Sequence, residues 1–410
     1  MIKDLERFEF GFISHLFSKK GVWIGDNSPI NCKAINIGLC KNYRLSPIYH
    51  RKYDVVWLYE DIVFNYGSGW RLVIDESIRL INESGYLVIR TKDSNKGTIF
   101  ELKSLLARNT GLDVSLDQQE LLRDGSIVSV FKINRKNIEL YSNKLWTIGV
   151  ITNGEKEDVI SSLILKTLKL IDRDLVEFII VGPKLNGLSE IDLDLKYFDL
   201  EYKDDLARIS KKKKLILEKA KNPNVAIFHD RYIINDDFFE GFEYFGYDFD
   251  YLTISQNYES GSYFPSYVGF EYRSFKWQNP CYEKSYNELF EGHFVNGGLI
   301  ILKKTKLTIS SFNSLLLHNE AEDVELAFLL RCHGIVPRMN FYSSATTVGI
   351  ADNYTDSFKL YVHLKTQEPA IVEHMKKIAE NLWKKLPNSL KSRLRYSRAY
   401  NYVKEFLFHY

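Results

Sequence analysis

The chain has few cysteines, no long apolar run and almost no net charge. Its four cysteines, Cys32, Cys40, Cys281 and Cys332, form no CxxC pair and no zinc-like spacing with histidine, which favours a reducing cytoplasm. No run approaches the roughly 18 apolar residues that a membrane-spanning helix needs, so we expect any membrane contact to be peripheral. The formal net charge of +2 argues against a dedicated nucleic-acid binder.

The remaining composition is that of a globular protein. A share of 45% hydrophobic and 26% charged residues is ordinary, and 410 residues allow two or three domains. The first ten residues, MIKDLERFEF, are partly acidic and lack an apolar core, so they predict no secretory signal. The aromatic share of 14% is high, and it suits either core packing or surfaces that stack on sugars.

Residues 1–140 are predicted to form a first α/β unit. Short apolar strands alternate with helical patterns at Leu72–Ile81 and Ile99–Leu106, which indicates a parallel, Rossmann-like sheet. The predicted strands are Val22–Ile24, Ala34–Ile37, Asp54–Leu58, Tyr86–Arg90 and Ile127–Lys132.

Two passages of this unit, YDVVWLYEDIVFNY and IRLINESGYLVIRT, resemble the second half of a class I methyltransferase. That family binds S-adenosylmethionine with a glycine-rich turn after the first strand and a carboxylate after the second. Here the turn after the first strand carries only Gly25, and the second strand leads into Asn36-Ile37-Gly38-Leu39. Because side chains obstruct close backbone approach to a ligand, we expect a truncated, non-methylating relative that binds no S-adenosylmethionine.

A second α/β domain is predicted over residues 141–345. Trp146–Thr152 is a buried strand, an apolar stripe from Ile160 to Ile171 indicates a helix, and Glu177–Gly182 is another strand. Ligands of such sheets lie beyond the carboxyl ends of the strands. The pocket candidates at these ends are Thr152, Asn153 and Gly182.

Basic residues and a lone acid follow in this domain. The run Lys211–Lys214 opens a helix that ends at Ala220, and it is either a solvated face or a cationic wall for phosphate. The strand Val225–Phe228 then leads into His229-Asp230-Arg231. After a segment from Phe238 to Tyr286 that is rich in aromatics, either an acceptor platform or core filling, comes FVNGGLIILKK.

A helix from Val324 to Cys332, ended by Gly334, is expected to carry Glu322 and Asp323 at its N-terminus. Together with Gly297-Gly298, the run Glu322-Asp323-Val324-Glu325-Leu326 resembles the acceptor-side half of GT-A glycosyltransferases, and the resemblance covers about Leu145 to Phe341.

This resemblance implies a role for each matching position. Asp323 would be the general base of an inverting sugar transfer, with Glu322 beside it. Asp230 with His229 would hold a divalent metal, Mn²⁺ or Mg²⁺, in place of the family's two carboxylates. The implied donor-binding residues are Thr152, Asn153, Gly182, Lys213, Lys214, Asp230 and Arg231, and the implied acceptor-binding residues are Gly297, Gly298 and Trp277.

The last part, residues 346–410, is predicted to be an extension with basic amphipathic helices. Residues 371–410 hold nine Lys and Arg against three Glu, so they suit either contact with a membrane surface or packing on the protein body.

The resemblance to GT-A enzymes predicts a cytoplasmic, inverting glycosyltransferase, which the basic C-terminal helices could bring to the inner face of the membrane. It would move a sugar from a nucleotide sugar to a glycan or lipid-linked acceptor, and the resemblance suggests bacterial surface polysaccharide synthesis. A glycan methyltransferase and a non-catalytic glycan-binding scaffold are the alternatives.

Overall fold

The computed structural model describes residues 11–183, 185, 187, 195–198, 206–271, 276–281, 287, 293–306, 312–318, 320–354 and 387. Side chains are not described at 270, 271, 276–281, 293 and 306. Described residues up to Val268 and from Cys281 to Ile350 belong to one compact unit, and Gly269–Pro280 with Ala351–Tyr410 form a second. The basic helices predicted near the C-terminus lie outside the described residues, and the predicted domain boundaries stay predictions.

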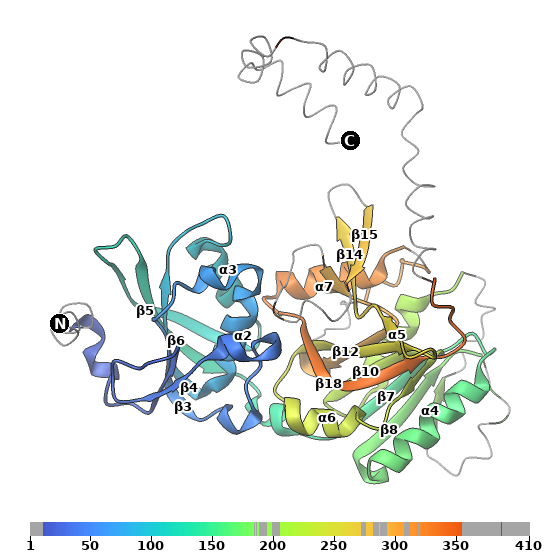
Figure 1. The fold of residues 1–410 in the computed structure, drawn as a ribbon. Coiled ribbons are helices and arrows are strands. Elements are labelled where there is room, and N and C mark those ends of the chain that lie inside the picture. The colour runs from blue at the N-terminus through green and yellow to red at the C-terminus, as the bar shows by residue number, and fades with distance from the viewer. Residues whose placement is uncertain are drawn as a thin grey trace. The chain divides into compact units, whose positions relative to one another are not determined.

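The N-terminal third of the chain contains a six-stranded sheet with the order β2-β1-β3-β4-β6-β5 (Figure 1). Strand β3 is buried along nearly its whole length, as expected of a central parallel strand. The strands are β1 (Gly21–Ile24), β2 (Lys33–Ile35), β3 (Tyr53–Leu58), β4 (Ile81–Thr91), β5 (Leu112–Leu121) and β6 (Ile127–Arg135). The helices are α2 (Trp70–Leu80) and α3 (Ile99–Arg108).

The prediction of a purely parallel sheet is wrong for the last two strands. Strands β2, β1, β3 and β4 are parallel, but β6 runs antiparallel to both β4 and β5. Strand β5 lacks a continuous apolar run: Leu112, Val114 and Leu116 alternate with polar residues, and most of its side chains are exposed because it forms the edge of the sheet. A short connection turns β5 back into β6, and this hairpin makes both pairings antiparallel.

The second sheet has the order β11-β18-β12-β17-β10-β7-β8-β9, and β13 pairs with β12. Its helices are α4 (Glu157–Leu170), α5 (Ile209–Lys219), α6 (Phe238–Phe245) and α7 (Glu322–Cys332). Its strands are β7 (Trp146–Ile151), β8 (Val176–Val181), β9 (Leu195–Phe198), β10 (Asn224–His229), β11 (Tyr232–Ile234), β12 (Tyr251–Tyr258), β13 (Tyr263–Phe264), β17 (Leu299–Lys303) and β18 (Arg338–Thr347).

The other elements are short. The strands outside the two large sheets are β14 (Tyr267–Glu271), β15 (Lys276–Cys281) and β16 (His293–Val295). The 3-10 helices are Gly11–Leu16, Ile37–Leu39, Lys41–Tyr43, Pro47–Tyr49, Val63–Gly69, Ile138–Ser142, Arg173–Leu175 and Lys304–Lys306.

The connections of the second sheet create a switch point between β7 and β10. From β7 the chain builds outward through β8 and β9, and then β10 adds on the other side of β7. Strands β7, β8 and β10 are parallel, so their carboxyl ends share one edge. Chain segments leave such an edge in opposite directions, which opens a crevice where α/β sheets bind ligands.

Much of the aromatic segment fills the core rather than forming a platform. Four phenylalanines of α6 are buried, and three of them, Phe238, Phe239 and Phe242, pack around Trp146. The ring centroids of Phe242 and Trp146 are 4.7 Å apart. Tyr251 and Tyr258 of β12 are buried too, while Tyr244 and Tyr263 remain exposed. Core packing therefore explains most of the described aromatic residues here.

A buried cluster of charges joins the N-terminal third of the chain to the second sheet. Arg79 of α2 is 2.6 Å from Asp248, and Arg135 of β6 is 2.8 Å from the same carboxylate. Arg338, at the start of β18, reaches back to Asp75 of α2 at 3.0 Å. Burial alone would raise the pKa of Asp248, but Arg135 and Arg79 outweigh it and hold that pKa well below its usual range.

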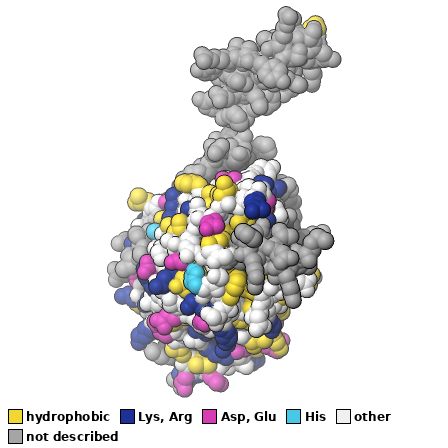
Figure 2. All heavy atoms as spheres, turned by 90° about the vertical axis from the view of Figure 1, so that its left-hand side faces the viewer, with side chains coloured by type: hydrophobic (Ala, Val, Ile, Leu, Met, Phe, Trp, Pro, Cys, Tyr) yellow, Lys and Arg dark blue, Asp and Glu magenta, His cyan; other side chains and the backbone are white. Residues whose placement is uncertain are grey.

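The outer surface contrasts with this cluster. Figure 2 shows basic, acidic and hydrophobic side chains intermixed over the described part of one face, as on an ordinary solvated surface. Among the described residues, no helix is both long and apolar enough to cross a membrane.

We predict that Asp248→Asn lowers the free energy of unfolding by about 3 kcal/mol, because buried Arg135 loses its carboxylate partner and buried Arg79 keeps only Asp75 and Asp250. Asp236→Asn is the matched control, since Asp236 pairs with Lys166 on the surface. That change is expected to cost less than about 1 kcal/mol. Urea unfolding at neutral pH measures both, and equal losses would show that the buried cluster adds no more than a surface pair.

Candidate functional site

The candidate site lies at the switch point, where β7 and β10 end side by side. Thr152 follows β7 and Asp230 follows β10, and the Thr152 hydroxyl donates a hydrogen bond of 2.7 Å to Asp230 Oδ2. The backbone amide of Asn153 approaches the same oxygen at 3.4 Å. A cavity of about 350 Å³ opens beside these residues. Its volume is within the range of small-molecule sites.

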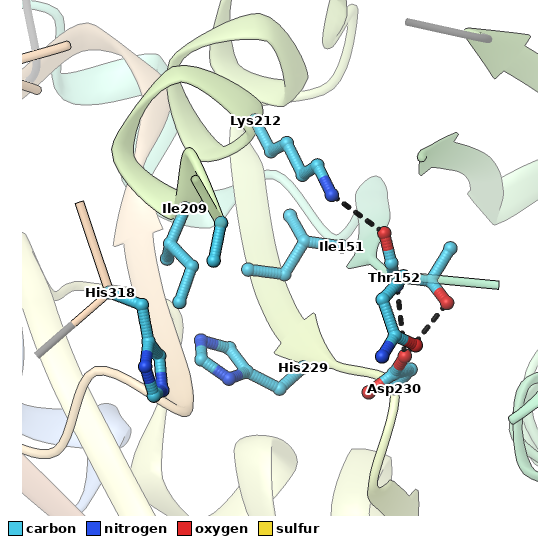
Figure 3. A pocket seen from close by; sticks show the side chains of 9 residues that line it. Ile151, Thr152, Ile209, Lys212, His229, Asp230 and His318 are labelled. Carbon is cyan, nitrogen blue, oxygen red and sulfur yellow. Dashed lines mark hydrogen bonds between the residues drawn. The ribbon is translucent and has the colours of Figure 1, made fainter. Parts of the chain in front are cut away.

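Helix α5 and a later loop form the opposite wall of the cavity (Figure 3). Lys212 reaches across from α5 and donates 2.8 Å to the Thr152 carbonyl. The ring of His318 lies opposite the ring of His229, and the His318 amide donates to the Ala207 carbonyl at 3.1 Å. The cavity is lined by Ile151, Thr152, Asn153, Ala207, Ile209, Lys212, His229, Asp230 and His318.

The electrostatics of this cavity favour an anion. Burial holds the pKa of His229 well below its usual range, and the positive charges of Lys213, Arg231 and Lys212 lower it further. Nε2 of His229 is closed to solvent and has no hydrogen-bond partner among the described residues. The imidazole is therefore neutral at pH 7 and stands in a cationic surrounding that would stabilise a bound phosphate.

The carboxylates of α7 form a second cluster beside the Gly-Gly step. Asp323 Oδ2 accepts a hydrogen bond of 3.0 Å from the Gly297 amide. A Cβ atom at Gly297 would lie 2.7 Å from the Cβ of Asp323, so only glycine allows this approach. The next residue, Gly298, accepts 2.9 Å from the His229 amide. The acidic helix end is thus connected to the cavity wall through two consecutive glycines.

Glu322 is the buried member of the acidic pair. It accepts a hydrogen bond of 2.7 Å from Lys213, whose side chain is fully buried. Burial raises the pKa of Glu322 to about 7, although the Lys213 charge acts in the opposite direction. Asp323 is less buried than Glu322, which leaves it the more accessible of the two carboxylates.

The structure distributes the predicted donor residues over two places. Thr152, Asn153 and Asp230 line the cavity, and Gly182 abuts Thr152, because a Cβ at Gly182 would lie 2.3 Å from the Thr152 carbonyl oxygen. Lys213 belongs instead to the cluster around Gly297 and Glu322.

Two other predicted residues, Lys214 and Arg231, are not among the residues that line the cavity. Lys214 is partly exposed, and Arg231 lies with its guanidinium carbon 5.7 Å from the Phe264 ring centroid. The side chain of Trp277 lies outside the described part of the structure, so its predicted acceptor role stays a prediction.

Sequence reasoning missed two polar residues of the cavity, Lys212 and His318. Lys212 could have been found, because Ile209, Lys212, Lys213 and Ile216 fall at helical spacing and share the buried side of α5. His318 lies in an irregular segment far along the chain, and no local pattern marks it.

The described side chains do not form a metal site by themselves. No cluster of three or more His, Cys, Asp and Glu residues with suitable geometry occurs within the described ranges. Among the described residues that line the cavity, Asp230 is the only carboxylate, and one of its oxygens already accepts from Thr152. These residues do not fit a protein-held ion, which normally has several oxygen ligands.

The sequence matches no family model and no curated protein. The solved structures that are similar to part of the chain include the following two. GalNAc-T7, crystallised with UDP, GalNAc and Mn²⁺, matches at a TM-score of 0.40 and 11% identity over 56% of this chain and 51% of its own. The S. aureus TarS fragment 1-349 matches at 0.33 and 13% identity, over 54% of this chain and 72% of its own. The chain therefore spans about half the length of GalNAc-T7.

We predict that Gly297→Ala lowers the free energy of unfolding by about 1 to 3 kcal/mol, because the new methyl group displaces Asp323 from a packed position. Gly11→Ala is the control, since no atom of the described residues lies within 4 Å of its Cβ position. Thermal unfolding compares the two variants. Equal melting points for Gly297→Ala and the wild type would show that the contact with Asp323 relaxes freely.

Proposed function

We propose that the protein is a glycosyltransferase that uses a nucleotide-sugar donor. The observation that carries the proposal is the cavity at the switch point between β7 and β10, with Thr152, Asp230 and Lys212 on its walls. Ligands of open α/β sheets bind at such crevices. The cationic surrounding of His229 suits a diphosphate, and the acidic end of α7 adds a base nearby.

Different cavity residues would bind the nucleoside, the phosphates and the sugar of the donor. Thr152 and Asn153, at the end of β7, would contact the nucleoside, and the Lys212 amine would move from the Thr152 carbonyl to a phosphate oxygen. Asp230 is held in place by Thr152 and would accept hydrogen bonds from sugar hydroxyls. Such interactions would stabilise the negative charge that develops on the departing nucleoside diphosphate.

Asp323 is the proposed base. The acceptor hydroxyl would attack the anomeric carbon while its proton passes to an Asp323 oxygen, and the bond from that carbon to the diphosphate breaks with its electron pair. In-line attack of this kind inverts the anomeric centre. The Gly297 amide fixes the carboxylate, and the absence of a side chain at Gly297 lets Asp323 approach that peptide closely. At Gly298 the corresponding space is taken by the side chains of Arg231 and Tyr232.

The acceptor and cellular setting follow the prediction from the sequence: a glycan or lipid-linked acceptor at the inner face of a bacterial membrane, in surface polysaccharide synthesis. If a divalent metal takes part, the donor diphosphate would have to supply the oxygen ligands that the described residues lack.

The methyltransferase alternative concerns the first sheet, and we rank it second. The Glu60 carboxylate lies against the turn after β1, because a Cβ at Gly25 would be 2.0 Å from Glu60 Oε2. The Trp23 indole holds that carboxylate with a 2.7 Å hydrogen bond. A non-catalytic glycan-binding scaffold is the third candidate, and it predicts carbohydrate binding without turnover.

Nucleotide binding is expected to need Lys212. Calorimetry with UDP, the nucleotide found in the GalNAc-T7 structure, is the first test, repeated with other nucleoside diphosphates, in Mn²⁺ and in EDTA. We predict that Lys212→Met weakens binding about tenfold or more, because a charge-assisted contact to phosphate is lost. Lys214→Met is the matched control and is expected to bind like the wild type. If only Lys214→Met weakened nucleotide binding, the phosphate would have to lie on the other side of α5. If binding were lost in EDTA, a metal ion would take part in it.

Asp323→Asn is expected to leave nucleotide affinity nearly unchanged and to lower turnover of the nucleotide sugar by about 10² to 10⁴, the usual contribution of a positioned base. Release of the nucleoside diphosphate, measured with a coupled assay, gives the rate. Turnover close to the wild type would exclude Asp323 as the base, and absence of turnover by the wild type with every nucleotide sugar would favour the scaffold.

A further inference from the structure

Asp323 belongs to a closed ring of contacts with Lys213, Gly297 and Glu322. Lys213 Nζ donates 2.7 Å to the Gly297 carbonyl and 2.7 Å to Glu322 Oε1. The Gly297 amide donates 3.0 Å to Asp323 Oδ2, and Asp323 follows Glu322 directly in α7. One ammonium group therefore sets the position of both the peptide that binds Asp323 and the residue next to Asp323.

The ring is buried and contains a group that titrates near neutrality. Glu322 is 9% exposed and Lys213 is 0% exposed. The charged and titratable groups around Glu322 are Lys213 of α5, Asp323 of α7 and Tyr251 of β12. Burial dominates among these influences, and it raises the pKa of Glu322 to about 7.

Two polar atoms at this place have no partner within the described structure: Glu322 Oε2 and the Tyr251 hydroxyl oxygen. Tyr251 is 1% exposed, and its own pKa is raised by burial and by the charges of Asp323 and Glu322. A buried carboxylate oxygen without a hydrogen-bond donor raises the free energy of the ionised form, so this carboxylate takes up a proton readily.

We propose that Lys213 and Glu322 are positioning residues for Asp323, and that a proton taken up by Glu322 loosens the ring and lowers transfer activity. This inference rests on the proposed function, since Asp323 is the base there. The ionised Glu322 carboxylate anchors the Lys213 ammonium, which in turn holds the Gly297 peptide with its amide directed at Asp323. Protonation removes the ionic part of that anchor, so the peptide and the base lose their fixed orientation.

The ring also connects the two clusters of the site. Lys212 and Lys213 are neighbours on α5, and the first contacts the cavity wall at Thr152 while the second holds the ring. A donor phosphate that draws Lys212 away from Thr152 therefore acts on the same helix turn that positions the base.

The first test uses no substrate. The Gly297 amide is observed by NMR in the full chain, labelled with ¹⁵N-glycine, from about pH 5.5 to about pH 8.5. We expect its chemical shift to titrate with a midpoint near 7, unchanged in Glu325→Gln and absent in Glu322→Gln. Glu325 is the matched control because it lies on the same helix turn and is exposed. A flat wild-type response, or a titration that persists in Glu322→Gln, would overturn the proposal.

Lys213→Met tests the direction of the coupling. Without the ammonium, burial acts on Glu322 unopposed, so the pKa of Glu322 should rise and the Gly297 midpoint should move to higher pH. Lys213→Arg should restore a midpoint close to that of the wild type, because it keeps the charge. A midpoint in Lys213→Met that stays in place or falls would contradict the coupling.

The second test is the pH profile of turnover. In the wild type, kcat should fall as pH drops through about 7, by about 10- to 100-fold, while KM for the nucleotide sugar changes little. Glu322→Gln should remain at the low-pH rate throughout, and Glu325→Gln should follow the wild type. Full wild-type turnover in Glu322→Gln would overturn a positioning role, and a loss as deep as in Asp323→Asn would make Glu322 the base instead.

Stability supplies an independent check on the titration. A carboxyl group that holds its proton more tightly when folded stabilises the protein below its unfolded pKa, and this contribution is lost as pH rises through the folded pKa. The wild type should therefore lose stability relative to Glu322→Gln between about pH 5 and about pH 7. A constant difference would contradict the titration. If the protein shows these titrations but turns over no nucleotide sugar, the proposed function is refuted and the coupling between Glu322 and the Gly297 peptide still holds.

Discussion

The buried ammonium of Lys213 is the interaction on which the candidate site depends. It lies where α5, the turn after β16 and the start of α7 converge, and it contacts the Gly297 carbonyl and Glu322. A buried charge is tolerated only when it is paired and hydrogen-bonded, so these three segments are held at fixed separations. The position of Asp323 follows from this constraint, because its partner is the amide of the same glycine.

The sheet supplies the other half of the arrangement. The change of direction between β7 and β10 places Thr152 and Asp230 next to each other, although they are 78 residues apart in the chain. Antiparallel pairing of β10 with β17 then brings the Gly-Gly step against His229. Polar groups from distant segments thus meet at one edge because the strand order requires it.

Buried ion pairs connect the N-terminal third of the chain to the second sheet. Arginines from α2, β6 and β18 surround the carboxylates of Asp75 and Asp248 in a region shielded from water. Removing one partner of such a network leaves an uncompensated charge, whereas the intact network fixes how the segments meet. The two sheets are therefore linked by specific pairs, and Arg338 extends the link into the second sheet at β18, the strand next to the edge strand β11.

The sequence by itself determined the α/β class, the strands with continuous apolar runs and the helix that carries Glu322 and Asp323, because hydrophobic periodicity and helix-end signals are local. It could not supply the antiparallel edge strand β5, which is mostly polar, or α6, whose phenylalanines look alike in a core and in a platform. It also could not separate Lys212 from Lys213. One faces the cavity and the other the buried ring, and this difference depends on which distant carbonyls and carboxylates the fold brings to each side of α5. Burial decided the rest: it raises the pKa of Glu322 and lowers that of His229, and burial is a property of the tertiary structure alone.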